Sequence, residues 1–407
     1  MTANSQPDNA QSKAATPQTE ISFLRLISTG IATKFLIDSG FQIFNPFLPL
    51  IATGLGADLV TMGRLISVRN LVGLLAPIAG TVGDRVGYRR VIRFGMLVLI
   101  VGLVLLGSSS SVAPAMVAMV LLGFSHVCVT PMLQAYVSSK LPYSQRARGI
   151  GMLEYSWALT GIIGLSLIGY LIQATSWRVP FFVLAACMAG MWLVFGFMPE
   201  VKSHGEVRKF NLIDLIRVDE NRRSTYATIA AGALNYFAGS QLMLIYGQWL
   251  QHDYALQPFQ LGTVAFWLGW SDLLMGSVLV SLITDRIGKR VSLIAGTIVS
   301  LIGYLLMPIF NTALIPAVAS MALARGGFEF AIVANISLLS EQTPKQRGKA
   351  LTLGGALWQL TGALTGIITP WIFQHWNMRG VTTVSAVAVG LGMIVALTLV
   401  REVGSDT

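Results

Sequence analysis

Charged residues are scarce in this chain of 407 residues. Asp, Glu, Lys and Arg make up 11% of it and hydrophobic residues 54%, whereas soluble domains average roughly 25% charged residues. A soluble protein of this length could not remove so much apolar surface from water. The composition therefore excludes the ordinary soluble class and predicts a protein whose solvent is lipid.

Cysteine and histidine are also few. The two cysteines, Cys128 and Cys187, lie inside apolar runs, where a free cysteine behaves as a small packing residue. No GxxxxGK[ST] loop for a nucleotide phosphate occurs, which argues against an ATP-driven pump. We expect no metal, no cofactor and no enzyme, because metal-site spacing is absent among the histidines: His126, His204, His252 and His375.

The first 20 residues lack the apolar segment of a signal peptide. They are polar and rich in Gln, Ser and Ala, which is typical of a disordered segment. We expect residues 1–21 to form a disordered cytoplasmic tail, and residues 401–407 to form a short tail on the same side.

The chain contains many long apolar runs. A helix needs about 20 mostly apolar residues to cross a bilayer, and such runs occur twelve times. They predict an all-α membrane protein with twelve transmembrane helices at roughly 24–50, 59–83, 91–110, 113–138, 149–172, 179–198, 226–250, 262–283, 291–310, 315–339, 350–373 and 380–400.

Basic residues gather in alternate turns between these spans. Counting both termini, 22 of the 28 Lys and Arg residues fall on one side. Because cytoplasmic loops carry an excess of Lys and Arg, we expect both termini and the central connection in the cytoplasm. The net charge of +10 is then a signal of membrane topology, and we expect no nucleic-acid partner.

The connection at 199–225 is the only long one. It divides the chain into an N-terminal six-helix half at 22–198 and a C-terminal six-helix half at 226–400. Within it, "FNLIDLIRV" at 210–218 has apolar residues at helical spacing beside basic ones. This pattern predicts a short helix on the cytoplasmic membrane surface, with a plain structural linker as the alternative.

A charged turn interrupts the apolar sequence twice. "VGDRVGYRR" at 82–90 and "ITDRIGKRV" at 283–291 share an Asp-Arg pair and a glycine, 201 residues apart. The same offset relates Trp157 to Trp358 and Arg146 to Arg347. Duplicated six-span halves are typical of secondary transporters, whose substrate site lies between the halves near the membrane midplane.

These features resemble the major facilitator superfamily over roughly 22–400. "GTVGDRVGYRR" is similar to that superfamily's signature between spans two and three. "SLITDRIGKR" is a weaker copy between spans eight and nine, with Ser281 in place of the first glycine. The resemblance implies two pseudo-symmetric six-helix halves that rock about a central cavity lined by spans one, four, seven and ten.

The charged turns are expected to act as a conformational latch. In the superfamily this turn contacts helix ends of the opposite half in one access state and releases them in the other. Glycine permits the tight turn, and an aspartate near a helix N-terminus is stabilised by typically ~0.3–1 kcal/mol. A loop that merely follows the positive-inside rule is the alternative. The predicted latch residues are Gly80, Asp84, Arg85, Gly87, Arg89, Arg90, Asp285, Arg286 and Gly288.

Ionisable residues inside the spans form the candidate site. Each costs at least ~2.5–3.5 kcal/mol at the centre of a membrane helix, so they are rare and functional by default. In the first span, Lys34, Asp38, Gln42 and Asn45 form a polar stripe on one helix face, which should line a wet cavity. The predicted substrate and proton-coupling residues are Asp38, Gln42, Arg69, His126, Asp272, Arg325 and Glu329.

Two ion pairs are predicted among these residues. Asp38 and Arg69 lie at similar depths in adjoining spans, and Arg325 and Glu329 are four residues apart on one helix. A carboxylate that pairs with an arginine in one state and takes a proton in another would couple transport to protons. Asp38 is the first candidate for that role. A static ion pair that holds the bundle together is the alternative for each pair.

The roles expected of the remaining polar and aromatic residues are less specific. Asp272 is as readily structural as functional, and Glu154 is expected to meet nearby cytoplasmic arginines. His126 either titrates near neutral pH or is simply hydrogen-bonded. Trp157 and Trp358 are expected to be packing residues.

The sequence as a whole predicts a secondary active transporter that moves a small molecule by alternating access. Proton-coupled export of an amphipathic or hydrophobic compound is favoured, because the cavity carries aromatic and Met side chains beside few charges. The alternative is a proton-coupled symporter for uptake of an organic anion, with Arg69 and Arg325 as its charge partners. Span five lacks the glycine–proline motif of many drug–proton antiporters, which weakens the case for drug export. We expect a monomer in the plasma membrane.

Overall fold

The computed structural model of the chain describes residues 22–200, 217–344 and 346–402. These residues form helices joined by short turns, with no strand among them. The predicted all-α fold is confirmed. The two predicted tails and most of the predicted surface helix at 210–218 lie outside the described residues.

Nine α-helices and two short irregular helices make up the described part of the N-terminal half. They are α1 (Phe23–Gln42), α2 (Phe44–Leu55), α3 (Leu59–Val72), η1 (Gly73–Leu75), α4 (Ala76–Val86), α5 (Tyr88–Ser108), α6 (Val112–Lys140), α7 (Tyr143–Leu159), η2 (Thr160–Leu165), α8 (Ser166–Ala174) and α9 (Val179–Gly196).

The C-terminal half follows the residues left undescribed at 201–216. Its described elements are α11 (Arg222–Tyr254), α12 (Pro258–Leu273), η3 (Leu274–Leu279), α13 (Val280–Ile287), α14 (Lys289–Leu306), α15 (Leu314–Gln342) and α16 (Arg347–Thr398).

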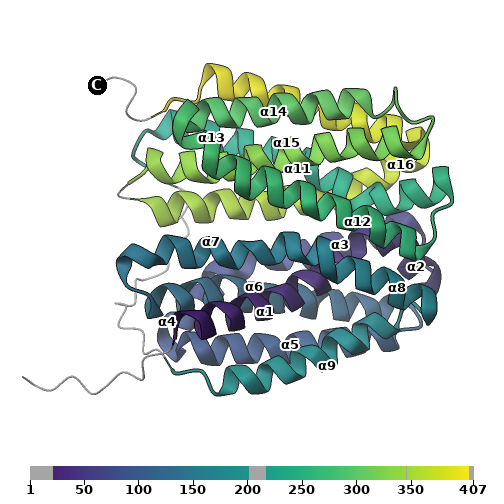
Figure 1. The fold of residues 1–407 in the computed structure, drawn as a ribbon, viewed down its shortest axis with the longest axis horizontal. Coiled ribbons are helices and arrows are strands. Elements are labelled where there is room, and N and C mark those ends of the chain that lie inside the picture. The colour runs from purple at the N-terminus through teal and green to yellow at the C-terminus, as the bar shows by residue number, and fades with distance from the viewer. Residues whose placement is uncertain (1–21, 201–216, 345, 403–407) are drawn as a thin grey trace, which may run out of the picture.

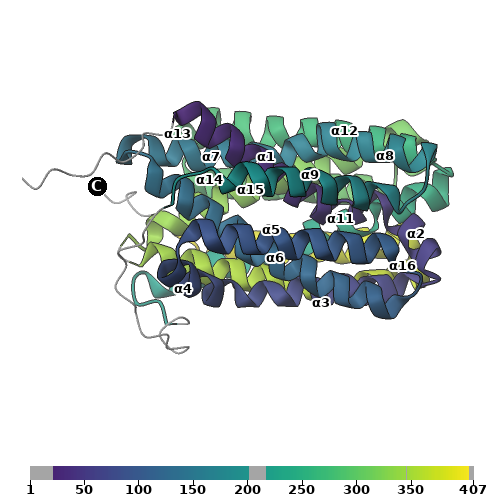
Figure 2. The same cartoon turned by 90° about the horizontal axis from the view of Figure 1, so that it is seen from below.

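The helices gather into two bundles that lie side by side (Figure 1). The purple-to-teal helices α1–α9 form one bundle and the green-to-yellow helices α11–α16 the other, with most helices running along the long axis of the molecule. The view from below shows the same alignment (Figure 2). The predicted division into two helical halves is therefore confirmed.

The number of spans depends on how broken helices are counted. Within the described residues, ten helices are long and apolar enough to cross a membrane, or eleven if α1 and α2, bent by 51°, count as one span. The helix α16 has 52 residues but contains a non-helical residue, Asn377. At 1.5 Å per residue it would extend about 78 Å, more than twice the roughly 30 Å hydrocarbon core. The break supports the twelve-span prediction, because 347–376 and 378–398 are each long enough to cross.

Two spans contain a turn of π-helix. It occupies η2 between α7 and α8, and η3 between α12 and α13. Close backbone contact ties the first of these turns to α12, because a methyl group on Gly161 would lie 2.8 Å from Gly269 Cα. Such turns concentrate at functional sites in other proteins. Here the first of them, η2, lies at the contact between the halves.

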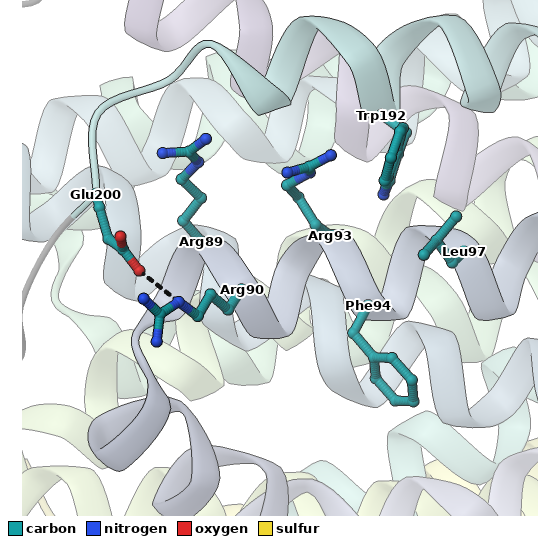
Figure 3. Close-up of a pocket in the computed structure, with 7 residues that line it drawn as sticks. All are labelled: Arg89, Arg90, Arg93, Phe94, Leu97, Trp192 and Glu200. Atoms are coloured by element: carbon teal, nitrogen blue, oxygen red, sulfur yellow. Dashed lines mark ion pairs between the residues drawn. The ribbon is translucent and has the colours of Figure 1, made fainter.

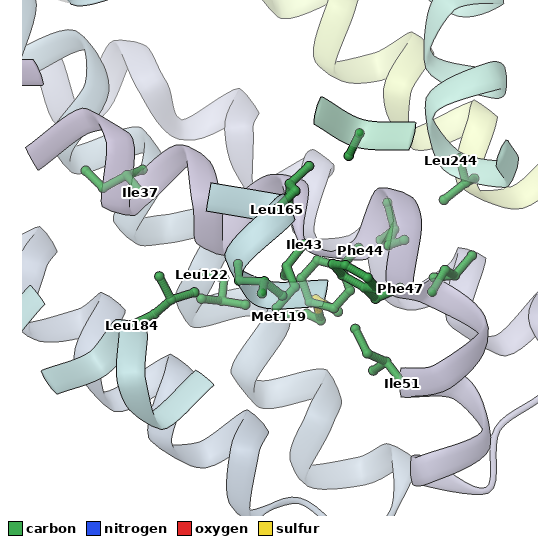
Figure 4. Close-up of a cluster of buried hydrophobic side chains, with 14 of the residues drawn as sticks. Ile37, Ile43, Phe44, Phe47, Ile51, Met119, Leu122, Leu165, Leu184 and Leu244 are labelled. Atoms are coloured by element: carbon green, nitrogen blue, oxygen red, sulfur yellow. The ribbon is translucent and has the colours of Figure 1, made fainter. Parts of the chain in front are cut away.

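A buried apolar cluster holds the bend between α1 and α2 (Figure 4). Ile43, Phe44 and Phe47 are fully buried at the bend and pack with Met119 of α6. Leu244 of α11, in the opposite half, belongs to the same cluster. Burial of each such side chain stabilises a protein by roughly 1.5–3 kcal/mol in water. In lipid the gain comes from close packing instead.

The two halves meet most closely away from the predicted cytoplasmic turns. A side chain at Gly63 of α3 would overlap the Gly366 carbonyl oxygen of α16, and one at Gly247 of α11 would overlap the Pro46 carbonyl oxygen. Ser67 donates a hydrogen bond to the Ala363 carbonyl oxygen across the same contact, at 2.6 Å. Four glycines near the predicted cytoplasmic ends have no atom within 4 Å of such an added methyl group: Gly80, Gly151, Gly348 and Gly355. The close atoms around Gly83, Gly149, Gly288 and Gly354 belong to their own half.

Candidate functional site

The two charged turns have the same backbone form. Gly87 separates α4 from α5 with φ 101°, and Gly288 separates α13 from α14 with φ 89°. Side-chain-bearing residues rarely adopt this conformation, so glycine is required at both positions. Asp84, Arg85 and the matching pair in the second half, Asp285 and Arg286, are exposed at the helix ends.

Several side-chain contacts of these turns lie within their own half. Asp84 accepts a hydrogen bond from the Tyr88 hydroxyl at 2.8 Å, Arg89 donates to the Gly196 carbonyl oxygen, and Arg90 pairs with Glu200 at 2.8 Å. In the second half, Lys289 pairs with Glu341, and its backbone N–H donates to Glu402 at 2.6 Å. These contacts link no turn to the opposite half in this conformation, so the latch role stays a prediction.

A buried charge cluster joins α1 to α7. Lys34 and Asp38 are 3% and 1% exposed, and Lys34 Nζ lies 3.0 Å from Asp38 Oδ2. Ser156 donates to Asp38 at 2.6 Å and accepts from Lys34 at 3.1 Å. Lys34 also pairs with Glu154 at 3.2 Å. The cluster therefore holds one cation between a buried carboxylate, Asp38, and a half-exposed one, Glu154, and we name it the α1–α7 cluster.

Two predictions about these residues were wrong. Asp38 pairs with Lys34 and not with Arg69, because Lys34 is one helical turn away on the same face of α1. Glu154 pairs with Lys34 and accepts a hydrogen bond from Gln134, in place of the expected cytoplasmic arginines.

A second buried cluster joins α12 to α15 in the other half. Arg325 donates two hydrogen bonds to the Asp272 carboxylate, at 2.7 and 2.5 Å, which is the bidentate geometry of a strong pair. Glu329 lies 4.0 Å from the same guanidinium. The predicted Arg325–Glu329 pair is present, but Asp272 takes the closer position. This α12–α15 cluster again holds two carboxylates around one cation.

Glu329 lies at the boundary between the halves. The Trp157 side chain of α7, in the opposite half, lies close enough to its carboxylate to interact with it electrostatically. Its side chain is 13% exposed, against 5% for Asp272. Trp157 was expected only to pack, and the sequence signal that marks it is its repetition as Trp358 at the 201-residue offset.

Arg69 is the buried cation that neither cluster includes. It is 4% exposed, and no ion pair joins it to a carboxylate among the described residues. Its guanidinium lies over the Phe41 ring at 3.6 Å and donates to the Phe41 carbonyl oxygen at 2.9 Å. Its Nε has no hydrogen-bond partner among the described residues. Tyr236 of the opposite half is close enough to interact with it electrostatically.

Aromatic rings surround this arginine. The His126 ring packs on Phe41 with centroids 4.9 Å apart. Across the boundary, Tyr236 stacks on Trp358 with centroids 5.6 Å apart and planes 6° from parallel. Trp358, expected only to pack, therefore forms a stacked pair. We name Arg69 and these rings the Arg69 site.

The α12–α15 cluster also borders a small central void. Gln42 and Tyr246 line this void with Asp272 and Arg325, and its volume is about 10 Å³, near the minimum for one water molecule. Gln42 donates a hydrogen bond to the Trp157 carbonyl oxygen at 3.2 Å. Gln42, Asp272, Arg325 and Glu329 therefore lie near the boundary between the halves, whereas the hydrogen-bond and ion-pair partners of Asp38 among the described residues belong to its own half.

Comparison with known proteins identifies a family. The sequence model of the Major Facilitator Superfamily matches residues 31–218 and 228–406. The MFS-type transporter YceJ of Bacillus subtilis is 26% identical over 359 residues, covering 86% of this chain and 90% of YceJ. Multidrug resistance protein 1 of Bacillus subtilis is 27% identical over 164 residues, 40% of this chain and 41% of that protein.

A solved structure shares the fold. The human organic anion transporter MFSD10 (TETRAN) superposes with a TM-score of 0.70 at 16% identity, over 92% of this chain and 100% of that one. At this identity the likeness concerns the fold alone.

Proposed function

Since the chain belongs to the Major Facilitator Superfamily and is a multi-pass membrane transporter, we propose that it exports a small amphipathic or hydrophobic compound in exchange for protons. The proposal places it in the plasma membrane with both termini in the cytoplasm. The two halves rock about the central site, and the conformation described here is the one closed on the outer side.

Proton coupling is supported by the charge balance of the α12–α15 cluster. Asp272 and Glu329 lie around one cation, Arg325, and their side chains are only 5% and 13% exposed. Unpaired negative charge inside a membrane is costly, and binding a proton removes it. This cluster therefore gains from taking up one proton, whereas Glu154, the second carboxylate of the α1–α7 cluster, is 51% exposed.

The single observation that carries the proposal is the position of Glu329. It is the carboxylate that Arg325 holds less closely, and the Trp157 side chain of the opposite half lies close to it. When the halves move apart, Glu329 loses this neighbour and its surroundings change. A change of surroundings between access states is what converts a proton gradient into directed movement.

The substrate class is supported by the Arg69 site and by relatives. The aromatic faces of Tyr236, Trp358 and Phe41 suit flat apolar groups, which such rings bind by stacking. Multidrug resistance protein 1 of Bacillus subtilis, which matches 40% of this chain, is named for resistance to multiple drugs, and export of an amphipathic compound is one way to provide resistance.

The test uses the purified full-length protein in proteoliposomes, with a panel of amphipathic compounds and a pH-sensitive dye inside. We expect substrate entry to expel protons. In Glu329→Gln, proton-driven accumulation should fall to the level of protein-free liposomes, while exchange of labelled for unlabelled substrate persists. Asp38→Asn tests the α1–α7 cluster in the same way.

Asp58→Asn is the matched control. Asp58 is an exposed N-cap of α3 whose side chain accepts from the Thr61 N–H at 2.8 Å, and asparagine caps about as well. It should accumulate substrate like the unmodified protein. Full accumulation in Glu329→Gln would sink the assignment of Glu329.

One observation favours a second candidate, the uptake of an organic anion with protons. Arg69 is a buried cation with no carboxylate partner among the described residues, and a carboxylate substrate could supply one. Arg325, by contrast, already has a carboxylate partner, because it pairs with Asp272. Protons and compound entering together in the same assay would favour this candidate over export.

A further inference from the structure

A pocket on the flank of the N-terminal half lies outside the proposed transport site. It has a volume of about 350 Å³ and lies between α5 and α9, at the end of the bundle where the predicted cytoplasmic turns lie. Arg89, Arg90 and Arg93 line it, with Trp192 of α9 on one side and Glu200 on the opposite side (Figure 3).

Positive charge in this pocket exceeds its negative charge. Among the described residues, Glu200 is the one carboxylate that lines it, and Arg90 pairs with it at 2.8 Å. Arg89 donates to the Gly196 carbonyl oxygen. The guanidinium of Arg93 lies over the Trp192 ring at 4.0 Å. Two of the three arginines therefore have no carboxylate partner among the described residues.

Two buried N–H groups at the pocket have no acceptor among the described residues. They are Arg93 Nε and Trp192 Nε1. A buried donor left unsatisfied costs roughly 1–3 kcal/mol. An oxygen-rich anion bound between α5 and α9 would satisfy both.

The N-terminus of α5 also favours a bound anion. Its first turn has no acidic residue and no side-chain cap, and it carries Arg89 and Arg90 instead. Cations at this end oppose the helix dipole, whereas anions are stabilised there. The protein's own groups therefore do not balance the positive charge of the helix N-terminus and of its two arginines.

The second half of the chain provides an internal comparison. At the 201-residue offset, Arg93 corresponds to Ile294 and Lys140 to Glu341. There, Lys289 at the start of α14 pairs with Glu341, and Glu402 accepts from its backbone N–H. The second half thus balances its turn with protein carboxylates. The first half has Lys140 where the second has Glu341, and an excess of arginine.

The mouth of the pocket is apolar. Phe94 and Leu97, one and two turns along α5, are 55% and 43% exposed, on a helix that spans the membrane. Basic pockets between membrane helices on the cytoplasmic side bind anionic lipid headgroups. We propose that this pocket holds the phosphate of an anionic phospholipid between Arg89, Arg93 and Trp192, with an acyl chain along Phe94 and Leu97.

The experiment measures lipid binding to the full-length protein in detergent by native mass spectrometry. The probes are short-chain phosphatidylglycerol, short-chain phosphatidylcholine and glycerol 3-phosphate. We expect phosphatidylglycerol to bind at least about fivefold more tightly than phosphatidylcholine, the factor expected from one basic residue near an anionic headgroup. Equal binding of the two lipids would overturn the proposal, as would glycerol 3-phosphate binding as tightly as the lipid.

Variants locate the site. Arg93→Gln should weaken phosphatidylglycerol binding about fivefold, and Trp192→Phe, which keeps a ring but removes the N–H, about threefold. Arg290→Gln is the matched control, since Arg290 corresponds to Arg89 at the turn of the second half and should leave binding unchanged. If Arg93→Gln does not fold, the effect of Trp192→Phe on phosphatidylglycerol binding tests the pocket by itself. Equal loss in the control and the pocket variants would place the lipid elsewhere and refute the pocket.

Discussion

Lys34 is a primary amine with only 3% of its surface exposed, deep in the α1–α7 cluster. Removing a charged group of this kind from water costs several kcal/mol, which only close partners offset. Asp38, Glu154 and Ser156 supply those partners at 3.0, 3.2 and 3.1 Å. The stability of this part of the bundle therefore depends on the cluster remaining complete.

Lys34→Met should lower the free energy of unfolding by about 3–5 kcal/mol, because it leaves Asp38 buried without its cation. The double variant Lys34→Met/Asp38→Leu should recover most of this loss, since an apolar pair can replace a buried ion pair. The measurement is chemical denaturation of the purified protein in detergent.

The control for this change is Lys289→Met. Lys289 pairs with Glu341, and their side chains are 21% and 42% exposed, so its loss should cost about 0–1 kcal/mol. Equal effects of Lys34→Met and Lys289→Met would contradict the buried cluster.

The sequence predicted which polar residues lie inside the bundle better than it predicted their partners. Hydropathy gives the depth of a residue along its span, which is why Asp38, Arg69 and Arg325 were identified. It does not give the rotation of one helix against another, and a pairing depends on that rotation. Arg69 therefore has Phe41 beneath its guanidinium and Asp38 has Lys34, although Asp38 and Arg69 were expected to pair.

At the scale of elements, the break in α16 separates the last two spans. The sequence predicted a turn at 374–379 between two apolar runs, and Asn377 lies within it. Asn377 has φ 50° and ψ −156°, a region that is essentially restricted to glycine and costs another residue of order 1–3 kcal/mol. The π-helical turns η2 and η3, by contrast, have no marker in composition or periodicity.

Asn377→Gly should raise the free energy of unfolding by about 1 kcal/mol. It removes the steric cost of the side chain at this φ and ψ, and the gain exceeds the roughly 0.5–1 kcal/mol that glycine loses through its greater freedom in the unfolded chain. Asn377→Ala, which keeps the Cβ atom, should give no gain. The measurement is chemical denaturation of both variants under the same conditions. If both are destabilised to the same extent, the backbone at Asn377 is not strained.

At the scale of the whole molecule, the two halves touch through small residues. The duplicated pattern and the basic turns predicted the two halves, because the apolar runs and the charged motif repeat at an offset of 201 residues. They did not predict which end of the bundle closes, because both access states have the same sequence. The glycine contacts of α3 with α16 and of α2 with α11 place the closure away from the charged turns.

Gly366→Val should favour separation of the halves at this closed end. Its side chain would meet Ser67 and the Gly63 carbonyl oxygen, so the closed arrangement becomes strained. We expect the distance between spin labels on the α8–α9 and α11–α12 turns to increase, and substrate transport to slow severalfold as the closed state loses population.

Gly355→Val tests whether this effect is specific. Gly355 lies on the same helix α16, but a methyl group there would have no atom within 4 Å. The label distance should match that of the unmodified protein. An unchanged distance in Gly366→Val would show that these glycines do not control the closure.

The charge balance of the buried groups has an electrical consequence. Glu154 is 51% exposed, so the charged groups of the described interior are three cations, Lys34, Arg69 and Arg325, and three carboxylates, Asp38, Asp272 and Glu329. Their ionised forms have a net charge of zero. A transmembrane voltage acts on a charge that shifts when the halves rock, by up to about 2.3 kcal/mol per 100 mV. Binding one proton makes the interior charge plus one. In the proposed exchange, the membrane potential would then bias the singly protonated step and leave the unprotonated return step almost untouched.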